Sequence, residues 1–384
     1  MSAVDAQTFD FIVTGAGAAG RSFVYQLLHS PLRESKVLLI DQERKTTDDR
    51  TWCFWESTPG PFEEIVHYRW PELWFHTYDY TRQLDIAPFK YKMVKAADYY
   101  QFTDECFSKH KNVTVLLADV EQVENLPNGG GVMVQTSAGA YQGNWCINSI
   151  WRGSIDKQRV QYLDQHFKGW FVRTQEPVFS DADATLMDFR VPQEGDFRFM
   201  YVFPDSPHTA LFELAIFSNE HLTSAGYDEI IKRYIAAYWP QLLGYEVVRD
   251  EAGVIPMTDF VFPTRDQRIV NVGTAGGDTR ASTGYTFIYI HRRIERLIKA
   301  LQSGDQRLGD LNWFGQRHRY YDSLMLKVLA EDRYPGDQLF GRLFRNNPPA
   351  RLLRFLNGES SVPEELAVMS TAPIPTFLRA LVGA

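Results

Sequence analysis

Cysteine and histidine are sparse in this 384-residue chain, and neither occurs in a pattern typical of metal binding. The three cysteines, Cys53, Cys106 and Cys146, are far apart and odd in number, which argues against a disulfide framework, a zinc site and an iron–sulfur cluster. The nine histidines are scattered, with no HxxxH or HxH pair, so structural or surface roles are expected for them. We therefore expect a protein without a metal site.

Long apolar runs, a basic excess and the pattern of a signal peptide are also lacking. No window approaches the ~18–20 apolar residues that span a bilayer. Residues 1–10 lack the basic and apolar regions of a signal peptide, so a cytoplasmic protein is expected. The net charge of -8 argues against nucleic-acid binding. The length, with 44% hydrophobic and 23% charged residues, suits one large or two interlocked globular domains.

What is present begins with a glycine-rich turn between two apolar segments. Residues 9–14 have the pattern of a buried strand, and residues 15–20 read Gly-Ala-Gly-Ala-Ala-Gly. Residues 21–30 contain helix formers, and a second apolar strand over 36–40 ends at Asp41. This order of strand, glycine turn, helix, strand and acid predicts a Rossmann dinucleotide-binding unit.

Each residue of this motif has an expected role. Gly15 permits the tight turn, Gly17 lets the backbone approach a pyrophosphate, and Gly20 allows close packing of helix on strand. The N-terminus of the helix presents N–H groups and a positive dipole to the phosphates. The Asp41 carboxylate is expected to accept hydrogen bonds from the ribose hydroxyls.

Later segments complete the pattern of a flavoprotein. Residues 112–147 predict strands that return to the first sheet, and residues 168–260 predict a second, irregular sheet with one helix. A strand over 268–272 leads into a second glycine turn, which is expected to bind the ribityl and phosphate side of FAD. The turn residues that we assign to FAD binding are Gly273, Thr274, Gly276 and Gly277.

These elements predict an α/β fold in which a Rossmann-like FAD-binding domain is interleaved with a sheet-rich substrate domain and followed by a C-terminal helical region. The expected FAD-binding segments are 8–55, 91–150 and 264–305, the substrate-binding segments are 56–90 and 151–263, and the helical region is 306–384.

Several segments narrow the identification. Residues 49–55 read Asp-Arg-Thr-Trp-Cys-Phe-Trp, and residues 273–285 read Gly-Thr-Ala-Gly-Gly-Asp-Thr-Arg-Ala-Ser-Thr-Gly-Tyr. With segments such as 210–218 in the same order, essentially the whole chain resembles the FAD-dependent lycopene β-cyclases of the bacterial single-chain type. That family is related to the flavoprotein hydroxylases. The chain departs from the hydroxylase pattern at Thr274 and at 148–149, where hydroxylases carry Gly-Asp and Asp-Gly pairs.

The resemblance implies an isomerase, an intramolecular lyase that converts the acyclic ψ end groups of lycopene to β-ionone rings and so makes β-carotene. A proton adds to the terminal alkene, the resulting cation closes a ring, and loss of a proton completes the reaction. In this family reduced FAD is thought to stabilise the cation, with NAD(P)H as a reductant that is not consumed stoichiometrically.

The resemblance also implies an acid, for which Glu213 is our candidate. Strand alternation places Phe212 and Leu214 on the opposite face and leaves Glu213 beside Leu211 and Ala215. Desolvation among such neighbours would raise the pKa of the carboxyl and keep it protonated near neutral pH. The alternative is a strand glutamate that is exposed or paired with an arginine.

Other residues are candidates for the surroundings of the flavin. Arg50 is expected to contact the cofactor, and Asp278 is either a second carboxylate near the flavin ring or a solvent-facing loop acid. For Arg50, Trp52 and Trp55 taken singly, simple core packing is the alternative. The candidates for the substrate pocket are Trp52, Trp55, Phe212 and Tyr285.

A lipophilic substrate implies contact with a membrane. Residues 338–356 carry four arginines, no acids and bulky apolar residues at helical spacing, which is typical of a peripheral interfacial anchor. The alternative is a pair of helices that pack on the catalytic domain while their arginines reach solvent.

Two rival classes of function remain open. One is a flavin-dependent reductase or monooxygenase acting on prenyl chains, which would change the mass of its substrate, whereas an isomerase would not. The other is a non-catalytic, FAD-binding membrane sensor. An acidic residue within an apolar strand disfavours the sensor.

Overall fold

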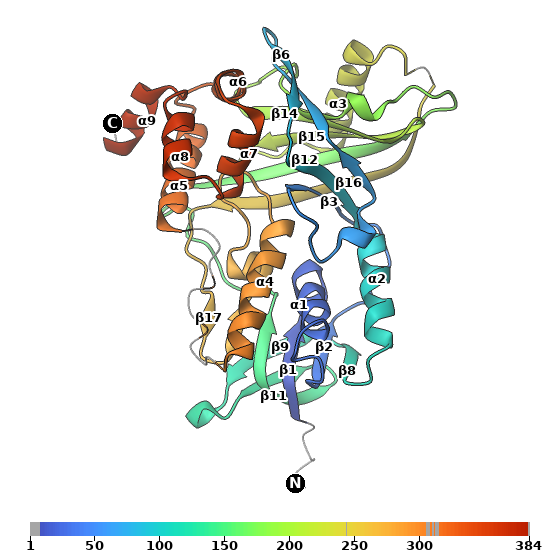
Figure 1. The fold of residues 1–384 in the computed structure, drawn as a ribbon, viewed down its shortest axis with the longest axis vertical. Coiled ribbons are helices and arrows are strands. Elements are labelled where there is room, and N and C mark those ends of the chain that lie inside the picture. Colours follow the sequence, from blue (N-terminus) through green and yellow to red (C-terminus); the bar gives the residue numbers. More distant parts are fainter. Residues whose placement is uncertain (1–7, 243, 305–307, 309–310, 312–314, 383–384) are drawn as a thin grey trace.

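The computed structural model describes residues 8–242, 244–304, 308, 311 and 315–382. Most of the segment on which the expectation of no leader depends (1–7), and parts of the expected C-terminal regions (305–307, 309–310, 312–314 and 383–384), lie outside the described residues. Figure 1 shows the glycine-turn unit in the lower half of the molecule and a second sheet across the upper half.

The first sheet has the order β17-β18-β11-β1-β2-β8, and β1 lies at its centre between β11 and β2, parallel to both. Its parallel strands therefore end at one edge, where Thr14 stands opposite Ile40 on β2 and Asn148 on β11. The strands are β1 (Thr8–Thr14), β2 (Val37–Asp41), β8 (Val113–Leu117), β11 (Gly139–Asn148), β17 (Arg265–Asp266) and β18 (Ile269–Asn271), and β9 (Val120–Asn125) and β10 (Val132–Thr136) join through β11.

Successive side chains of a strand point to opposite faces of its sheet, and those of the central strands are apolar on both faces. Both faces are therefore covered by other elements. On one face Phe11 and Val13 pack with Phe23 and Leu27 of α1 and with Ile294 of α4. On the other face, Ile12 and Leu38 pack with Val120 of β9 and with Val132 and Val134 of β10. The helices of this unit are α1 (Ala18–Leu28), α2 (Ala96–Ser108) and α4 (Phe287–Gln302).

The second sheet has the order β16-β12-β15-β14-β13-β5-β6 and is antiparallel except where β13 pairs with β5. Helix α3 (Ser224–Tyr238) packs on one face, and the cavity and the C-terminal helices lie on the other. The strands are β5 (Glu72–His76), β6 (Thr81–Asp85), β12 (Tyr162–Arg173), β13 (Thr185–Asp188), β14 (Phe197–Ser206), β15 (Thr209–Phe217) and β16 (Glu246–Thr258).

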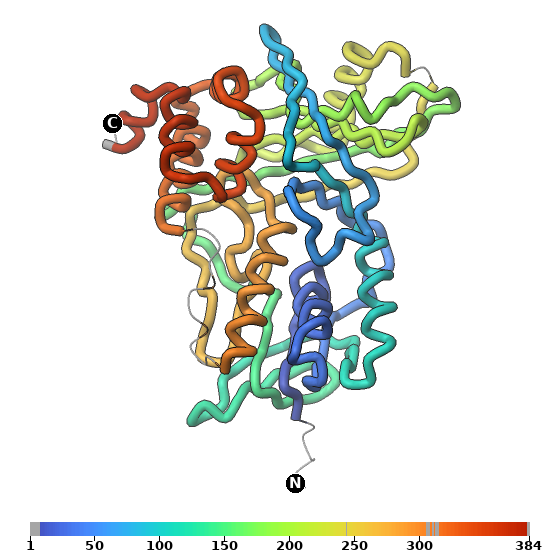
Figure 2. Tube along the Cα trace, in the orientation of Figure 1, coloured from blue at the N-terminus to red at the C-terminus, as the bar shows by residue number. Residues whose placement is uncertain are grey.

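A small third sheet, β3-β7-β4, lies between the two large ones. Its strands are β3 (Thr51–Glu56), β4 (Tyr68–Trp70) and β7 (Lys90–Lys95). The ends of the expected FAD-binding segments at 55 and 91 thus fall within one sheet. Figure 2 shows the chain passing repeatedly between the lower and upper halves, so neither half is a continuous stretch of sequence. Short 3-10 turns occur at Glu63–Ile65, Pro127–Gly129, Asp181–Asp183 and Gly273–Gly276 (η4).

The C-terminal region is helical and packs at one end of the second sheet (Figure 1). Within the described residues, no helix has the length and apolar character needed to cross a membrane. The helices are α5 (Gln316–Ala330), α6 (Gly336–Asn346), α7 (Pro349–Asn357), α8 (Val362–Met369) and α9 (Ile374–Val382).

Helices α6 and α7 contain the stretch 338–356, and the structure corrects the expectation that its apolar residues face a membrane. These residues face inward, into the core below the second sheet. Arg345 pairs with Asp79 at 2.9 Å and Arg354 pairs with Glu364. Amphipathic spacing is the same whether a helix covers a protein core or a lipid surface, and here it covers the core. The buried side chains are Leu339, Phe340, Leu343, Phe344, Leu352 and Leu353.

Candidate functional site

A cavity of about 420 Å³ lies where the two large sheets meet. The N-terminus of α1 and the turn η4 form the wall toward the first sheet. Residues of β12, β14, β15 and β16 form the opposite wall, and β3 and residues 283–287 lie between them. The cavity therefore connects the glycine turns with the face of the second sheet that carries Glu213.

The first glycine turn has the geometry of a dinucleotide-binding loop. Gly15 has a φ of 90°, which L side chains rarely adopt. A Cβ at Gly20 would lie 1.9 Å from the Gly15 carbonyl oxygen, so only glycine allows α1 to approach the strand. At Gly17 no atom lies within 4 Å of where a Cβ would stand, and the residue lines the cavity.

Helix α1 directs its N-terminus at this cavity. Gly17, Ala18 and Ala19 line it, and no side chain caps the first turn. The unpaired N–H groups and the helix dipole favour an anion there. Asp41 lies beside the turn, where its Oδ2 accepts a hydrogen bond from the Ala16 N–H at 2.6 Å. These residues suit the phosphates and a ribose of a dinucleotide.

The second glycine turn contributes only part of the expected set. Gly273 and Thr274 line the cavity. Gly276 packs instead against the backbone of Asn271, and Gly277 against the Phe262 ring, since a Cβ would lie 2.3 Å from the Asn271 oxygen and 3.1 Å from the ring. We therefore assign the cavity contact to the first two residues of the turn.

Asp278 is neither a carboxylate facing the cavity nor a solvent-facing acid. Its side chain is buried, pairs with Arg293 at 2.9 Å and accepts a hydrogen bond from the Gly273 N–H at 2.6 Å. Burial raises the pKa of this carboxyl, against the opposing effect of the Arg293 charge. Its role is to hold the turn in place.

The aromatic candidates divide into two groups. Trp52 and Tyr285 line the cavity, and Trp52 stacks on Phe287 at 4.7 Å between ring centroids. Trp55 lies one layer behind, 4.6 Å from the Tyr285 ring, and its indole N–H donates to the Leu353 carbonyl. The expectation that Phe212 lines the substrate pocket is wrong. Its ring packs against α3, on the face of the second sheet that points away from the cavity.

Arg50 lies at the cavity wall, as expected for a residue near the cofactor. It is exposed, and its guanidinium donates to the Ala252 carbonyl at 3.2 Å. It therefore joins the start of β3 to β16.

Glu213 faces the cavity from the middle of β15. Leu211 and Ala215, on the same side of the strand, are buried in the core of that face, as alternation predicted. Burial raises the pKa of Glu213 well above its usual value, and the neighbouring Glu251 carboxyl raises it further. The opposing effect of Arg249 is smaller, so the site favours the neutral form of the Glu213 carboxyl.

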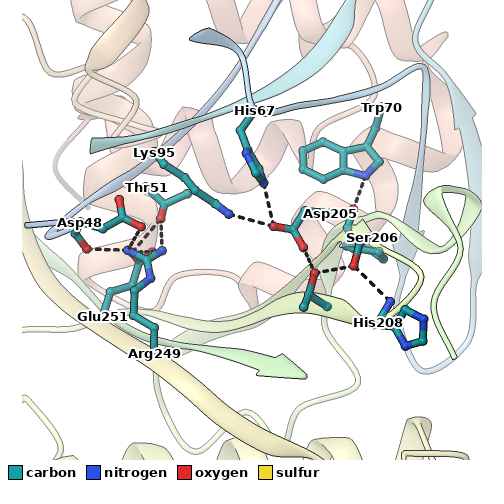
Figure 3. A network of polar contacts seen from close by, with 12 residues as sticks. Asp48, Thr51, His67, Trp70, Lys95, Asp205, Ser206, His208, Arg249 and Glu251 are labelled. Carbon is teal, nitrogen blue, oxygen red and sulfur yellow. Dashed lines mark hydrogen bonds and ion pairs between the residues drawn. The ribbon is translucent and has the colours of Figure 1, made fainter. Parts of the chain in front are cut away.

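Glu251 on β16 is a second carboxyl that sequence reasoning missed. A hydrogen bond joins it to Glu213. Thr51 Oγ1 donates to its Oε2 at 2.8 Å, and Arg249 Nη2 lies 3.3 Å from the same atom. Figure 3 shows Arg249 between Asp48, Thr51 and Glu251. Burial raises the pKa of Glu251 as well, whereas Arg249 and Thr51 lower it.

The tyrosine and cysteine side chains near Glu213 favour their neutral forms. Burial raises the pKa values of Tyr91, Tyr201 and Cys53 well above their usual range. The Tyr285 hydroxyl lies 3.1 Å from that of Tyr91. The cavity thus combines aromatic rings with neutral donors around one protonated carboxyl.

Two polar atoms in the cavity wall suit a bound polar group. Gln165 Oε1 and Thr283 Oγ1 are buried and find no hydrogen-bond partner within the described part of the chain, although both residues line the cavity. Buried polar atoms are nearly always paired, so this pair favours a ligand with polar edges.

Asp205 anchors the small third sheet next to the site. Lys95 of β7 lies 3.0 Å and His67 2.9 Å from its carboxylate, as Figure 3 shows. The pKa of Asp205 falls to about 2 because hydrogen bonds from His67 and Thr209 and the charge of Lys95 outweigh burial. This contact fixes β7 against the end of β14.

Comparison with protein families and sequences gives one consistent result. The family model described as lycopene cyclase protein matches residues 10–382. A lycopene beta-cyclase of Pantoea ananas is 22% identical over 392 residues, covering 97% of each chain. A lycopene beta-cyclase of Pseudescherichia vulneris is 26% identical over 268 residues, covering 65% of this chain and 62% of the relative.

Comparison with solved structures supports the fold. A geranylgeranyl bacteriochlorophyll reductase-like protein from Thermoplasma acidophilum superposes with a TM-score of 0.61 at 13% identity, covering 97% of this chain and 98% of the other. The halogenase PltM superposes with a TM-score of 0.63 at 14% identity, covering 98% and 92%. The predicted α/β fold, with a Rossmann-like unit, an interleaved second sheet and a C-terminal helical region, is therefore confirmed.

Proposed function

Because the chain belongs to the lycopene cyclase family, we propose that it converts the acyclic ψ end groups of lycopene to β-rings without net redox change. The observation that carries this proposal is the place of Glu213 at the wall of a cavity lined by aromatic rings, where burial raises the pKa of its carboxyl. An isomerisation that starts with protonation of an alkene needs such an acid, kept from water.

We assign the proton donation to Glu213. Its O–H bond breaks as a C–H bond forms at the terminal alkene, and the neighbouring double bond closes the ring on the cationic carbon. Loss of a ring proton then forms the new double bond. Trp52, Tyr201 and Tyr285 line the cavity along this path, and aromatic rings stabilise a nearby cation.

The residues around the glycine turns fit FAD. The open position at Gly17, the uncapped N-terminus of α1 and Asp41 would hold its phosphates and ribose. Gly273, Thr274 and Arg50 would line the rest of the cofactor, with Gln165 and Thr283 as polar partners. Bound FAD supplies, once reduced by NAD(P)H, a negatively charged ring that stabilises the substrate cation.

We further propose a peripheral contact with the membrane that dissolves the carotenoid. Helices α8 and α9 support it, because they expose apolar side chains. Their charged residues are Glu364 and Glu365, which pair with Arg354 and Arg317, and Arg379. Such a face enters the boundary between lipid headgroups and acyl chains. Its exposed members are Val362, Leu366, Ile374, Leu378 and Leu381.

Pigment analysis of lycopene-accumulating cells that express the chain tests the proposal. We expect cyclic products with the mass of lycopene. A gain of two mass units per bond would indicate a reductase, a gain of sixteen a monooxygenase, and unchanged lycopene a non-catalytic protein. The number of rings in the product decides whether one or both ends react.

A further inference from the structure

Two carboxyls meet across a row of residues on the cavity side of the second sheet. Tyr201 on β14 stands opposite Glu213 on β15, which stands opposite Gly169 on β12, and Gly169 stands opposite Glu251 on β16. Neighbouring strands lie ~4.8 Å apart, so the backbones of the two glutamates are about 10 Å apart. Gly169 lies between them and adds no side chain to this gap.

The surroundings of Gly169 show that Glu213 leans across it. A Cβ at this position would lie 3.2 Å from Glu213 Oε2, 3.2 Å from Glu213 Cβ and 2.9 Å from Leu211 Cδ1. The Glu213 carboxyl therefore lies above the glycine, where the hydrogen bond to Glu251 forms. Any larger residue would occupy this space.

Glu251 is held from its other side by a charged network. Arg249 Nη2 lies 3.3 Å from Glu251 Oε2, and Arg249 Nη1 lies 2.8 Å from Asp48 Oδ2. The Glu251 side chain is 4% exposed. The arginine and the Thr51 hydroxyl therefore favour the ionised form of Glu251. A hydrogen bond between two carboxyls requires one shared proton, and this asymmetry places it on Glu213.

We propose that Glu251 is a positioning residue that keeps the shared proton on Glu213 between turnovers, and that Gly169 provides the gap in which the two carboxyls meet. The proposal rests on the proposed function, since it concerns the same proton transfer. An ionised Glu251 beside Glu213 disfavours a second negative charge, so Glu213 stays protonated until substrate accepts the proton.

The proton count closes over one cycle. When the Glu213 O–H bond breaks and the C–H bond of the substrate forms, two carboxylates remain side by side. When the ring carbon later loses its proton, the electrons of that C–H bond form the new double bond, and the Glu213 carboxylate takes up the proton. One proton leaves the pair and one returns, so no oxidant or reductant is consumed.

The pH profile of Glu251→Gln tests this role. Arg249 on β16, Tyr201 on β14 and Cys53 on β3 also face Glu213, and the substitution leaves all three in place. Removing the negative charge lowers the pKa of Glu213, so less of it is protonated at a given pH. We expect the alkaline limb of kcat/KM to move down by at least about one pH unit, while the rate at the acidic end stays near that of wild type.

Infrared difference spectroscopy tests the pairing without turnover. Wild-type protein should show a protonated carboxyl at neutral pH that Glu213→Gln loses, because the proton is on Glu213 and Glu251 stays ionised beside Arg249. In Glu251→Gln the band should persist but titrate at lower pH. If wild type forms no cyclic product, the proposed function fails, and the infrared titration still decides whether the carboxyls share a proton.

Asp250→Asn is the matched control, because Asp250 is the adjacent acid on β16 and its carboxylate lies 3.7 Å from Lys168 on the other face of the sheet. It should keep the wild-type profile. Gly169→Ala should separate the carboxyls and shift the limb in the direction of Glu251→Gln. An unshifted limb in Glu251→Gln, whether activity is kept or lost uniformly at all pH values, would overturn the proposal.

Discussion

At the scale of single residues, the buried acid and the nucleotide loop perform separate tasks at opposite walls of one cavity. Glu213 lies within an apolar strand face, where burial favours the neutral carboxyl. Asp41 lies at the end of β2 beside the first glycine turn. One residue can therefore be changed without disturbing the contacts of the other.

Glu213→Gln keeps the shape of the side chain and removes the proton to be donated. We expect a folded, FAD-loaded protein that retains less than about a tenth of the wild-type rate, because the donated proton starts the reaction. HPLC of the pigments measures the rate, and Glu220→Gln, an exposed acid beyond the end of β15, is the control. A residual rate above a tenth, a loss of only ~1.4 kcal/mol of transition-state stabilisation, would mean that another group is the principal acid.

Asp41→Ala tests the assignment of the ribose partner. Removing a charged acceptor should weaken FAD retention by roughly 1–3 kcal/mol, measured as the dissociation constant of FAD from quenching of its fluorescence. Glu43→Ala removes an exposed carboxylate two residues away, which pairs with Lys45 at 2.6 Å, and should leave affinity unchanged. Equal affinities in wild type and Asp41→Ala would show that the acid has been misassigned.

Sequence reasoning predicted the residues whose roles depend on local order, and failed where roles depend on pairing between distant strands. The turn from Gly15 to Gly20 and the side of β15 on which Glu213 lies follow from adjacent residues. Glu251 follows another acid, Asp250, so its local sequence does not indicate a buried carboxyl. It lies thirty-eight positions from Glu213, and only the register of β15, β12 and β16 brings the two together. Phe212 was misplaced although the same alternation that placed Glu213 put it on the far face.

At the scale of elements, the C-terminal helices differ in what covers their apolar side chains, and the sequence pattern does not reveal this difference. Helices α6 and α7 cover the core, whereas α8 and α9 bury Val368 and Ala380 but expose Leu366 and Leu378. Helical periodicity reveals an apolar face but not what covers it. The expected membrane stretch was therefore placed on the helices that are buried.

Leu366→Ser with Leu378→Ser tests the lipid contact of α8 and α9. Both leucines are more than half exposed, so the protein should keep its fold and its flavin spectrum. Binding to anionic phospholipid vesicles should fall by roughly tenfold per leucine, since each insertion contributes about 1.5 kcal/mol or more. Sedimentation with vesicles measures it.

Val261→Ser is the control for this experiment, because Val261 is exposed but lies outside the C-terminal helices. Replacing Arg342 and Arg345 of α6 by glutamine should change vesicle binding less than the leucine pair does. Unaltered binding in the leucine variant would exclude α8 and α9 as the contact, and no binding by wild type would exclude the peripheral contact itself.

At the scale of the whole molecule, one cavity contains both a site suited to a redox cofactor and an acid whose proposed reaction has no net redox change. We expect many substrate molecules to be cyclised for each reducing equivalent supplied under anaerobic conditions, because the proposed chemistry moves only protons and the substrate's own electrons. Titration with limiting NAD(P)H, followed by counting of product molecules, measures the ratio. One NAD(P)H consumed per product would instead indicate a reductase.

The repeated crossing of the chain between the two halves (Figure 2) also governs how the protein can be synthesised. Strand β1 pairs with β11, so the residues of β1 cannot form these hydrogen bonds until residues 139–148 have been synthesised. Strand β18 joins the same sheet only after β12 to β16 have been synthesised. A nascent chain therefore leaves the ribosome with open strand edges, which are prone to aggregate. Folding of both sheets is completed late in translation, and fragments cut between the sheets will each retain an unpaired edge.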